Sequence, residues 1–566
     1  MSRKPNVVLV LTDDQGWGDL SCSGNTNLET PNIDKLATDG AVMDRFYVQP
    51  LCAPTRAEIL TGRYYARTGV HGVTTRAECM NLDEKTIADV FKEGGYATGC
   101  FGKWHSGSAY PYHPNGRGFD EFYGFCCGHW SHYFDSTLEH NGEETRGDGY
   151  IIDDFTDKAM AFMEEHRDEP FFCFVPFNTP HSPFQAPERW YEKFAGYETG
   201  MKHRDPEKED LPAIRCVLAM CENIDWNVGR LVDKVEDLGL TDDTIFIYLS
   251  DNGPNGDRWN GDMLGKKGSA DEGGVRSPCF IKWPLHIPEQ TVVKEIAGAI
   301  DFLPTLADMC GVELEGTKPL DGISIRQLLL AEGGDWPERP IFALESNMQI
   351  SSIRTQKYRA GGRAGGLYEL AADPGQRNDL KPERAEEHKR LMAQLDEWCG
   401  EVIPRDIANP ALPVGYPEFP KTYLNAQDGL KEGDIKWPSI HPNASYFVDW
   451  HNVEDGVEWE IDVNTAGEYE VTLMYTCAEG DEGSALRVSC GGESVEGVIE
   501  EPFDPPLRDG DDRVKRVVAY EKPFKPLTLG RIKLSAGEAR LRLEAVSKAG
   551  SEVCQLRSVR LELVGA

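Results

Sequence analysis

The sequence predicts an α/β domain built on a largely parallel sheet, followed by a separate all-β domain. From residue 6 to about residue 310, short apolar runs typical of strands alternate with stretches of helical periodicity. This alternation favours a parallel central sheet flanked by helices. After about residue 438, apolar and polar residues alternate within the strands, and turns rich in Gly and Asp separate them, as in a β-sandwich. The 566 residues suffice for several domains.

Four strand candidates of the first domain are each followed by a cluster of polar residues. The strands are "NVVLVLT", "ATGCFG", "FFCFVPF" and "TIFIYLS", and the clusters are "DD", "KWH", "NTPH" and "SDNG". Between the last two strands, "AIRCVLAMCENIDWNVGRLVDKVEDLGL" has the apolar spacing of a long helix. Because ligands of open α/β sheets bind beyond the carboxyl ends of the strands, we expect the four clusters to converge on one edge.

The rest of the chain divides into three further parts after an α/β domain at 1–330. Residues 331–402 favour a small antiparallel sheet closed by the helix "ERAEEHKRLMAQLDEWCGEV". Residues 403–437 include the Pro-rich passage "IPRDIANPALPVGYPEFPKTY", which is typical of a linker. Residues 438–566, with strands such as "VEWEIDV" and "GEYEVTLMYT", are predicted to form a jelly-roll-like sandwich.

The composition excludes several classes of partner. Lys and Arg total 59 against 95 for Asp and Glu, a formal net charge of -36, so the field of the molecule repels nucleic acid and an anionic substrate needs a local cationic pocket. The fifteen cysteines lie mostly in apolar runs, which favours reduced thiols. No run approaches the ~18 apolar residues of a membrane span. The pattern predicts a cytoplasmic protein as the chain stands, or a periplasmic or secreted one if a signal peptide was removed, and leaves the oligomeric state open.

A short helix is predicted where the chain reads "PLCAPTRAEILTG". Pro54 lies in its first turn, and Gly62 marks its end. Cys52 therefore lies at the positive end of the helix, where unpaired N–H groups attract anions. Arg56, four residues further on, lies on the same helical face.

Six segments together resemble the type I sulfatases, the formylglycine-dependent, arylsulfatase-like members of the alkaline phosphatase superfamily. They are "LTDDQGWGDL", "PLCAPTRAEILTGRY", "GKWHSG", "NTPHSPF", "LSDNG" and "GKKGSADEGGVRSP", and the resemblance covers about residues 5 to 400. It implies an alkaline-phosphatase-like fold and a sulfuric ester hydrolase. It also implies that a formylglycine-generating maturation enzyme converts Cys52 to formylglycine, with Pro54 and Arg56 completing the signal. The hydrate of that aldehyde would be the nucleophile.

The same resemblance implies a metal site. Its ligands would be Asp13, Asp14, Asp251 and Asn252, together with an oxygen of the modified Cys52. These are hard oxygen donors from two strand ends, suited to Ca²⁺, with Mg²⁺ as the alternative. The metal would lower the pKa of the nucleophilic hydroxyl and polarise a sulfate oxygen.

Four further residues match polar positions of the family: Lys103, His105, His181 and Lys267. The lysines would hold sulfate and leaving-group oxygens, where negative charge grows in the transition state. His181 would protonate the departing alcohol, and His105 would take a proton from the second hydroxyl of the sulfated hydrate, which expels sulfate. Lys266 is the less favoured substitute for Lys267.

The substrate class is predicted to be a sulfated saccharide, cleaved through a covalent sulfo-enzyme intermediate. The basis is that a chain with an appended sandwich resembles enzymes that act on carbohydrate, in which such sandwiches often bind glycan. The sandwich at 438–566 is therefore interpreted as an accessory carbohydrate-binding domain or, equally, as a packing or dimerisation module. One alternative is a phosphonate monoester or phosphodiester hydrolase of the same superfamily. Another is a non-catalytic protein that binds sulfated glycan. The loop "FCCGHWSHYFD" is interpreted as part of the substrate pocket or as packing, and Trp450 and Trp459 as sugar-stacking or core residues.

Overall fold

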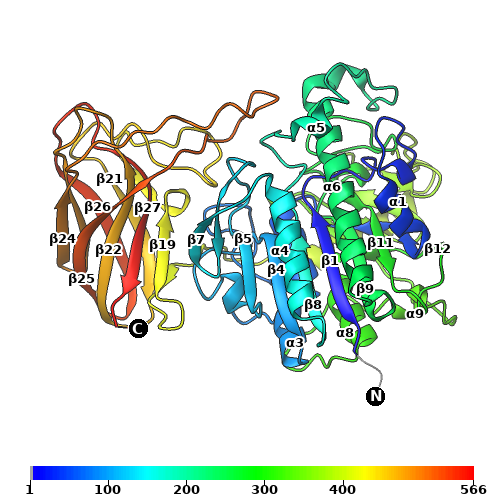
Figure 1. Cartoon of the computed structure of the whole chain (residues 1–566). Coiled ribbons are helices and arrows are strands. Elements are labelled where there is room, and N and C mark those ends of the chain that lie inside the picture. The colour runs from blue at the N-terminus through cyan, green and yellow to red at the C-terminus, as the bar shows by residue number, and fades with distance from the viewer. Residues whose placement is uncertain (1–3, 566) are drawn as a thin grey trace.

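The central sheet of the α/β domain has ten strands and is parallel at its centre (Figure 1). The structure is a computed structural model that describes residues 4–565. The strand order is β12-β2-β11-β9-β1-β8-β4-β5-β6-β7. In chain order these strands are β1 (Asn6–Thr12), β2 (Ala41–Met43), β4 (Ala97–Lys103), β5 (Glu121–Phe125), β6 (Thr137–His140), β7 (Glu143–Arg146), β8 (Phe171–Pro176), β9 (Thr244–Ser250), β11 (Cys279–Lys282) and β12 (Thr291–Val293). Strands β9, β1, β8, β4 and β5 are mutually parallel, which confirms the predicted sheet.

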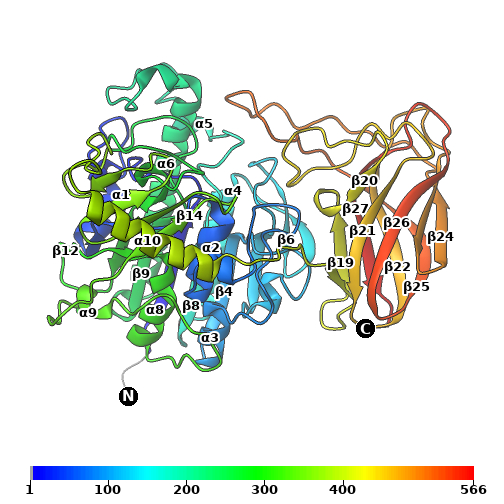
Figure 2. The ribbon, with the colours of Figure 1, turned by 180° about the vertical axis from the view of Figure 1, so that it is seen from behind.

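Alternate residues of β1 enter two different cores, one on each face of the sheet. Val7, Leu9 and Leu11 belong to one core, whereas Val8 and Val10 belong to the other, because successive side chains of a strand point to opposite faces. The second face is covered by α1 (Pro31–Thr38), α4 (Ile151–Glu165) and α6 (Leu211–Asp237). The first is covered by α2 (Cys52–Thr61), α3 (Ile87–Glu93), α8 (Phe302–Cys310) and α10 (Ala385–Val402) (Figure 2).

A four-stranded antiparallel sheet follows the α/β domain, as predicted. It consists of β14 (Ile341–Leu344), β15 (Ser351–Arg354), β16 (Tyr358–Gly361) and β17 (Leu367–Glu369), and α10 packs against it. The remaining short elements of the first part of the chain are β3 (Phe46–Tyr47), α5 (Glu188–Tyr191), α7 (Glu272–Val275), β10 (Arg276–Ser277), β13 (Ala297–Gly298) and α9 (Arg326–Leu329).

The C-terminal part is a sandwich of two sheets around its own apolar core. One sheet holds β18 (Leu412–Val414), β20 (Leu430–Glu432), β21 (Gly456–Val463), β23 (Ala485–Cys490), β24 (Glu493–Val498) and β26 (Gly537–Ser547). The other holds β19 (Lys421–Asn425), β22 (Gly467–Thr476), β25 (Lys525–Leu534) and β27 (Gln555–Leu563). Trp450 and Trp459 are fully buried in this core, so neither is a sugar-stacking platform.

The segment 403–437, expected to be a linker, supplies three strands of the sandwich. Strand β18 pairs with β21, β19 pairs with β27, and β20 pairs with β21. Both β18 and β19 are edge strands, the position in a sheet that tolerates proline such as Pro413 because one side needs no N–H donor. The linker expectation is therefore wrong for these strands, and the other domain boundaries stay predictions.

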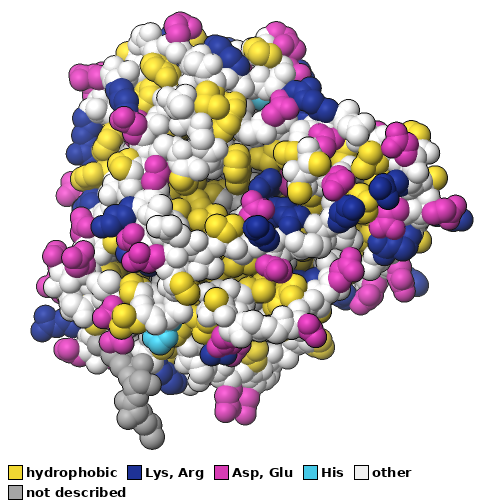
Figure 3. Space-filling model, turned by 90° about the vertical axis from the view of Figure 1, so that its right-hand side faces the viewer, with side chains coloured by type: hydrophobic (Ala, Val, Ile, Leu, Met, Phe, Trp, Pro, Cys, Tyr) yellow, Lys and Arg dark blue, Asp and Glu magenta, His cyan; other side chains and the backbone are white. Residues whose placement is uncertain are grey.

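The sandwich lies beside the β5–β7 edge of the α/β domain (Figures 1 and 2). Lys421 binds Glu143 at 2.6 Å, and Arg557 pairs with Glu144 across this junction. The opposite face of the α/β domain carries acidic side chains interspersed with Lys and Arg rather than one block of a single sign (Figure 3). Within residues 4–565, no helix combines the length and the apolar character that crossing a membrane requires.

Candidate active site

The four polar clusters converge at the carboxyl ends of neighbouring strands, as predicted. Asp13 and Asp14 directly follow β1, Asp251 directly follows β9, and Lys103 is the last residue of β4. Because β1 lies between β8 and β9 with β4 next to β8, these ends share one edge. The acidic residues, Asn252 and Lys103 are fully buried there.

Cys52 begins α2, and its thiol is buried at the positive end of that helix. Leu51 before it is extended, and Gly62 ends the helix with a left-handed φ of 67°, as the sequence indicated. Burial raises the pKa of the Cys52 thiol, although the charges of Lys103 and Lys267 oppose this rise. The unmodified thiol is therefore protonated at neutral pH and is a poor nucleophile and a poor redox sensor.

Arg56 connects two of the strand ends. Its Nη2 lies 2.9 Å from Asp251 Oδ2, and its Nη1 donates to the Lys103 carbonyl at 2.7 Å. Both side chains of the Arg56–Asp251 ion pair are inaccessible to solvent. Burial and the neighbouring charge of Asp13 raise the pKa of Asp251 to about 6, against the effect of Arg56.

Two lysines pair with the two aspartates that follow β1. Lys103 Nζ lies 2.7 Å from Asp13 Oδ2, and Lys267 Nζ lies 2.7 Å from Asp14 Oδ1. Burial alone would raise the pKa of Asp14, but Lys267 and His181 more than offset it and hold the pKa below its ordinary value. The neighbouring Lys266 instead extends to Asp257 at 2.5 Å, so the structure brings Lys267, not Lys266, into the site.

Two oxygen atoms in this cluster are buried without a hydrogen-bond partner among the described residues. They are Asp13 Oδ1 and Asn252 Oδ1. Ligand atoms of Asp13, Cys52 and Asp251 lie within 4.8 Å of one another, as do those of Asp13, Asp14 and His181. Unpaired buried oxygens are costly, and hard oxygen donors at this spacing suit a divalent cation. The residues present therefore fit a metal ion.

His105 is held in one tautomer by a backbone carbonyl. Its Nε2 lies 2.9 Å from the Val73 oxygen, and because a carbonyl only accepts, Nε2 carries the proton. The other nitrogen, Nδ1, is buried and has no partner among residues 4–565. Burial and the charge of Lys103 hold the pKa of His105 well below its ordinary value. The neutral ring thus keeps a free lone pair on Nδ1.

His181 is also neutral in this structure. Its Nδ1 donates to the Ser182 carbonyl at 2.7 Å, and its Nε2 lies 3.5 Å from Asp14 Oδ2. Burial, together with the charge of Lys267, lowers the pKa of His181 to about 3. Because the Ser182 carbonyl holds a proton on Nδ1, Nε2 is the nitrogen that can accept and deliver a second proton.

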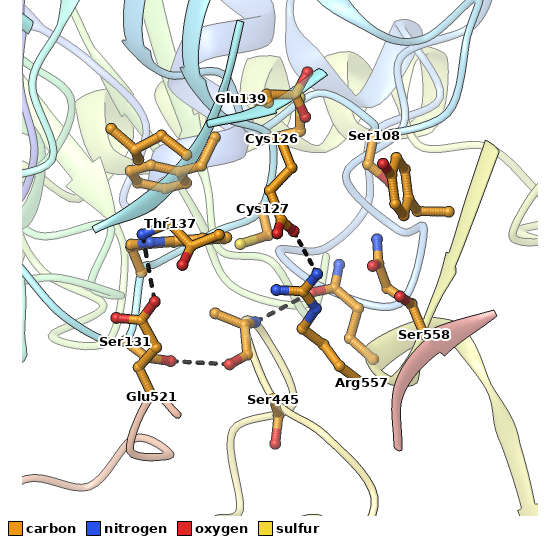
Figure 4. Close-up of a pocket in the computed structure, with 18 of the residues that line it drawn as sticks. Ser108, Cys126, Cys127, Ser131, Thr137, Glu139, Ser445, Glu521, Arg557 and Ser558 are labelled. Atoms are coloured by element: carbon orange, nitrogen blue, oxygen red, sulfur yellow. Dashed lines mark hydrogen bonds and ion pairs between the residues drawn. The ribbon is translucent and has the colours of Figure 1, made fainter. Parts of the chain in front are cut away.

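His129 belongs to the loop that the sequence assigned to the substrate pocket or to packing, and it was not among the predicted catalytic residues. Its ring stacks on that of His181 with centroids 6.0 Å apart, and its buried Nε2 has no partner in the described chain. Burial and the charge of His181 hold its pKa well below its ordinary value. The signal was present only in the density of His and Cys in "FCCGHWSHYFD". Of its other His and Cys residues, Cys126 and Cys127 line a separate cavity of about 160 Å³ between the two domains (Figure 4).

Several known sulfatases are similar to this chain in sequence or structure. The sulfatase family model matches residues 5–312, more than half of the chain. N-acetylgalactosamine-6-sulfatase of Mus musculus is 29% identical over 397 residues, covering 63% of this chain and 72% of that protein. Arylsulfatase A of Homo sapiens is 31% identical over 401 residues, covering 64% and 75%. The crystal structure of Ps i-CgsB in complex with k-i-k-neocarrahexaose is 28% identical, with a TM-score of 0.64, and covers 70% of this chain and 93% of that one. The chain belongs to the sulfatase family and is a sulfuric ester hydrolase.

Proposed function

We propose that this sulfatase removes sulfate from a sulfated saccharide, using a formylglycine at position 52 and a bound Ca²⁺ ion. The observation that carries the proposal is the convergence of Cys52, oxygen donors and cations in one buried cluster. Family membership implies a metal ion and a formylglycine in general terms. The substrate class is supported by relatives, one named N-acetylgalactosamine-6-sulfatase and one crystallised with k-i-k-neocarrahexaose.

The charge of the cluster suits an anionic ester. It contains three carboxylates and three cations: Asp13, Asp14, Asp251, Arg56, Lys103 and Lys267. Their formal charges cancel. A bound divalent ion would therefore make the cluster positive. A local positive site of this kind can attract a sulfate ester although the whole chain carries -36.

Asp13, Asp14, Asp251 and Asn252, with an oxygen of the modified Cys52, would hold the metal. The unpaired Asp13 Oδ1 and Asn252 Oδ1 are the oxygen atoms best placed to bind the metal ion. Ca²⁺ is favoured over Mg²⁺ because it accepts more oxygen ligands in less regular geometry. When bound, the ion would supply positive charge to the nucleophilic hydroxyl and to a sulfate oxygen.

Lys103, Lys267 and Arg56 would hold the sulfate group. All three are already fixed by ion pairs to the aspartates, so little side-chain reorganisation is needed when charge develops on the bridging oxygen. His181 is assigned to the leaving group: a hydroxyl oxygen of the hydrate at position 52 would bond to sulfur as the bridging S–O bond breaks, and Nε2 would deliver a proton to the alcohol oxygen. Because His181 is neutral without a ligand, the negative charge of the bound ester must favour its protonated form.

His105 is assigned to the second step. Its free Nδ1 would accept the proton of the remaining hydroxyl at position 52. The O–H electron pair forms the aldehyde C=O bond, the bond from that carbon to the sulfate oxygen breaks, and sulfate leaves with that electron pair. The fixed proton on Nε2 ensures that Nδ1, not Nε2, is the base.

The first test is the mass of the tryptic peptide "FYVQPLCAPTR", residues 46–56, from protein co-expressed with a formylglycine-generating enzyme. Conversion of Cys52 to the aldehyde is expected. A fully retained thiol, under conditions that mature a control sulfatase, would contradict the proposal and favour a glycan-binding protein.

The second test compares rates with an aryl sulfate, an aryl phosphonate and a phosphodiester, followed by a panel of sulfated sugars. Faster turnover of the sulfate, and release of sulfate from at least one sugar, are expected. Faster turnover of the phosphonate or the phosphodiester would instead identify a phosphorus ester hydrolase.

A further inference from the structure

We propose that the C-terminal sandwich completes the active site, with Asn443 as the residue that positions the base His105. This inference rests on the proposed function, because it concerns the proton transfer assigned to His105. Asn443 lies in the sandwich part of the chain, 370 residues away in sequence from the loop that it contacts. Its side chain is buried.

Asn443 and His105 donate to the same acceptor. Asn443 Nδ2 lies 3.3 Å from the Val73 carbonyl oxygen, and His105 Nε2 lies 2.9 Å from it. The other end of the amide accepts a hydrogen bond from Thr74 Oγ1 at 2.8 Å. The Asn443 amide therefore binds two consecutive residues of one loop and fixes the carbonyl that sets the tautomer of His105.

Gly128 shows how closely the two side chains approach each other. A Cβ atom added to Gly128 would lie 2.4 Å from Asn443 Nδ2 and 2.7 Å from His105 Nε2. Both distances are shorter than non-bonded contacts allow, so any side chain at position 128 would displace Asn443 or His105. Asn443, His105 and Gly128 thus meet at one point, one of them supplied by the C-terminal domain.

The loop that carries Val73 is irregular and is closed by local backbone hydrogen bonds, such as that from the Ala77 N–H to the Thr74 carbonyl. Val73 and Thr74 belong to no helix or strand, and the next two residues, Thr75 and Arg76, have left-handed φ angles of 55° and 71°. Arg76 also reaches the sandwich side, where its Nη1 donates to the Pro410 carbonyl at 2.8 Å. The loop is therefore held against the C-terminal part of the chain at more than one position.

A second sandwich segment binds the loop that contains His129. The long segment between β24 and β25 extends from the sandwich towards the α/β domain (Figures 1 and 2). From it, Arg516 Nη1 donates to the Ser131 carbonyl at 2.6 Å, and Arg508 Nη2 donates to the Phe134 carbonyl at 2.7 Å. Ser131 Oγ in turn donates to the Ala444 carbonyl at 2.9 Å. These bonds hold the segment next to Asn443 against the loop that contains His129.

The cavity between the two domains is not an anion site, so anion binding does not explain why the domains meet there. Its cations are already paired: Arg557 with Glu144 (Figure 4), and Lys522 with Asp504 at 3.1 Å. The two domains therefore meet through satisfied ion pairs around the cavity, and Asn443 is the sandwich side chain whose bonds lead directly to a proposed catalytic group.

The test uses the full-length, formylglycine-containing protein and three variants. Asn443→Leu has nearly the same size but removes both hydrogen bonds, and Thr74→Val removes only the bond to the amide oxygen. Lys421→Met is the matched control, because it deletes another contact between the domains, that of Lys421 with Glu143, away from Val73. Each is assayed with an aryl sulfate by rapid mixing, by intact mass and by thermal unfolding.

Asn443→Leu should slow breakdown of the sulfated enzyme about 10- to 100-fold, the range expected when a general base loses its orientation. Alcohol release should then show a burst of one equivalent, kcat and KM should fall together, and intact mass should show accumulated sulfated protein. Thr74→Val should show a smaller burst, and Lys421→Met none. Loosened domain packing alone would lower the thermal midpoint without a burst.

The outcomes distinguish this inference from the proposed function. If wild-type protein turns over the aryl sulfate and Asn443→Leu retains its kcat without a burst, the positioning role is wrong while the sulfatase mechanism stands. If the wild-type protein carries formylglycine but hydrolyses no sulfate ester, the proposed function fails and this inference fails with it.

Discussion

The carboxyl edge of the central sheet and the core of the sandwich are both buried, yet they hold opposite kinds of side chain. At the sheet edge, Arg56, Lys103 and Asp251 are buried with their charges, whereas the sandwich core is built from residues such as Trp459 and Leu541. Burying charge costs free energy unless it is paired, and apolar packing of the same volume is often more stabilising. The difference teaches that the sheet edge is arranged for reactivity and the sandwich core for stability.

Replacing Cys52 should produce the largest effect on activity and separate these two regions most sharply. Cys52→Ala removes the precursor of the nucleophile, so we expect turnover of an aryl sulfate to disappear. The free energy of unfolding should change by only ~1 kcal/mol, because one small buried group is lost. Rates and denaturant unfolding curves measure the two quantities.

The matched control is Cys554→Ala, which removes an equally buried thiol from the sandwich core. It should lose a similar amount of stability and keep full turnover. The comparison between the regions would be wrong if Cys554→Ala lost most of the activity or if Cys52→Ala retained it.

Breaking the buried ion pair between Arg56 and Asp251 should have the largest effect on stability. Arg56→Met leaves Asp251 buried without its cation, and such loss typically costs about 3–5 kcal/mol. The double variant Arg56→Met/Asp251→Asn should recover part of the unfolding free energy but none of the turnover. Chemical denaturation and an aryl sulfate assay report the two outcomes.

The exposed pair of Arg377 with Asp262 serves as the control for this prediction. Their side chains are each 53% exposed, and exposed pairs contribute about 0–1 kcal/mol. Arg377→Met should therefore barely shift the unfolding curve. Equal destabilisation by Arg56→Met and Arg377→Met would show that the buried pair contributes no more to the free energy of unfolding than the exposed pair does.

A feature could be predicted from the sequence when residues close together in the chain determine it. Strand β1 and the Cys52 helix follow local patterns, and Lys103 lies at a strand end, so their positions were predicted. The edge strands within 403–437 were missed because proline is tolerated at a sheet edge. Asn443 was missed because its bond to Val73 joins residues 370 positions apart, and no local pattern encodes such a contact.

The stability of the junction between the two regions is expected to depend on pH. Glu78 of the α/β domain and Asp428 of the sandwich line one small cavity together with Arg76. Burial, with the charge of Asp428, raises the pKa of Glu78 to about 8. Burial raises the pKa of Asp428 to about 7. Arg76 opposes both shifts.

The sign of the pH effect follows from these raised values. In the unfolded chain both carboxyls lose their protons near pH 4, so between about pH 4 and pH 8 the folded state binds more protons. Stability from this pair is therefore fully present below pH 4 and is lost as the pH rises to about 8. Thermal midpoints measured from pH 5 to pH 8.5 should fall with pH less steeply in Glu78→Gln than in the wild type. Equal slopes in the two proteins would mean that the junction does not hold Glu78 protonated. Burial between the domains would then shift the pKa of this carboxyl no more than exposure at the surface does.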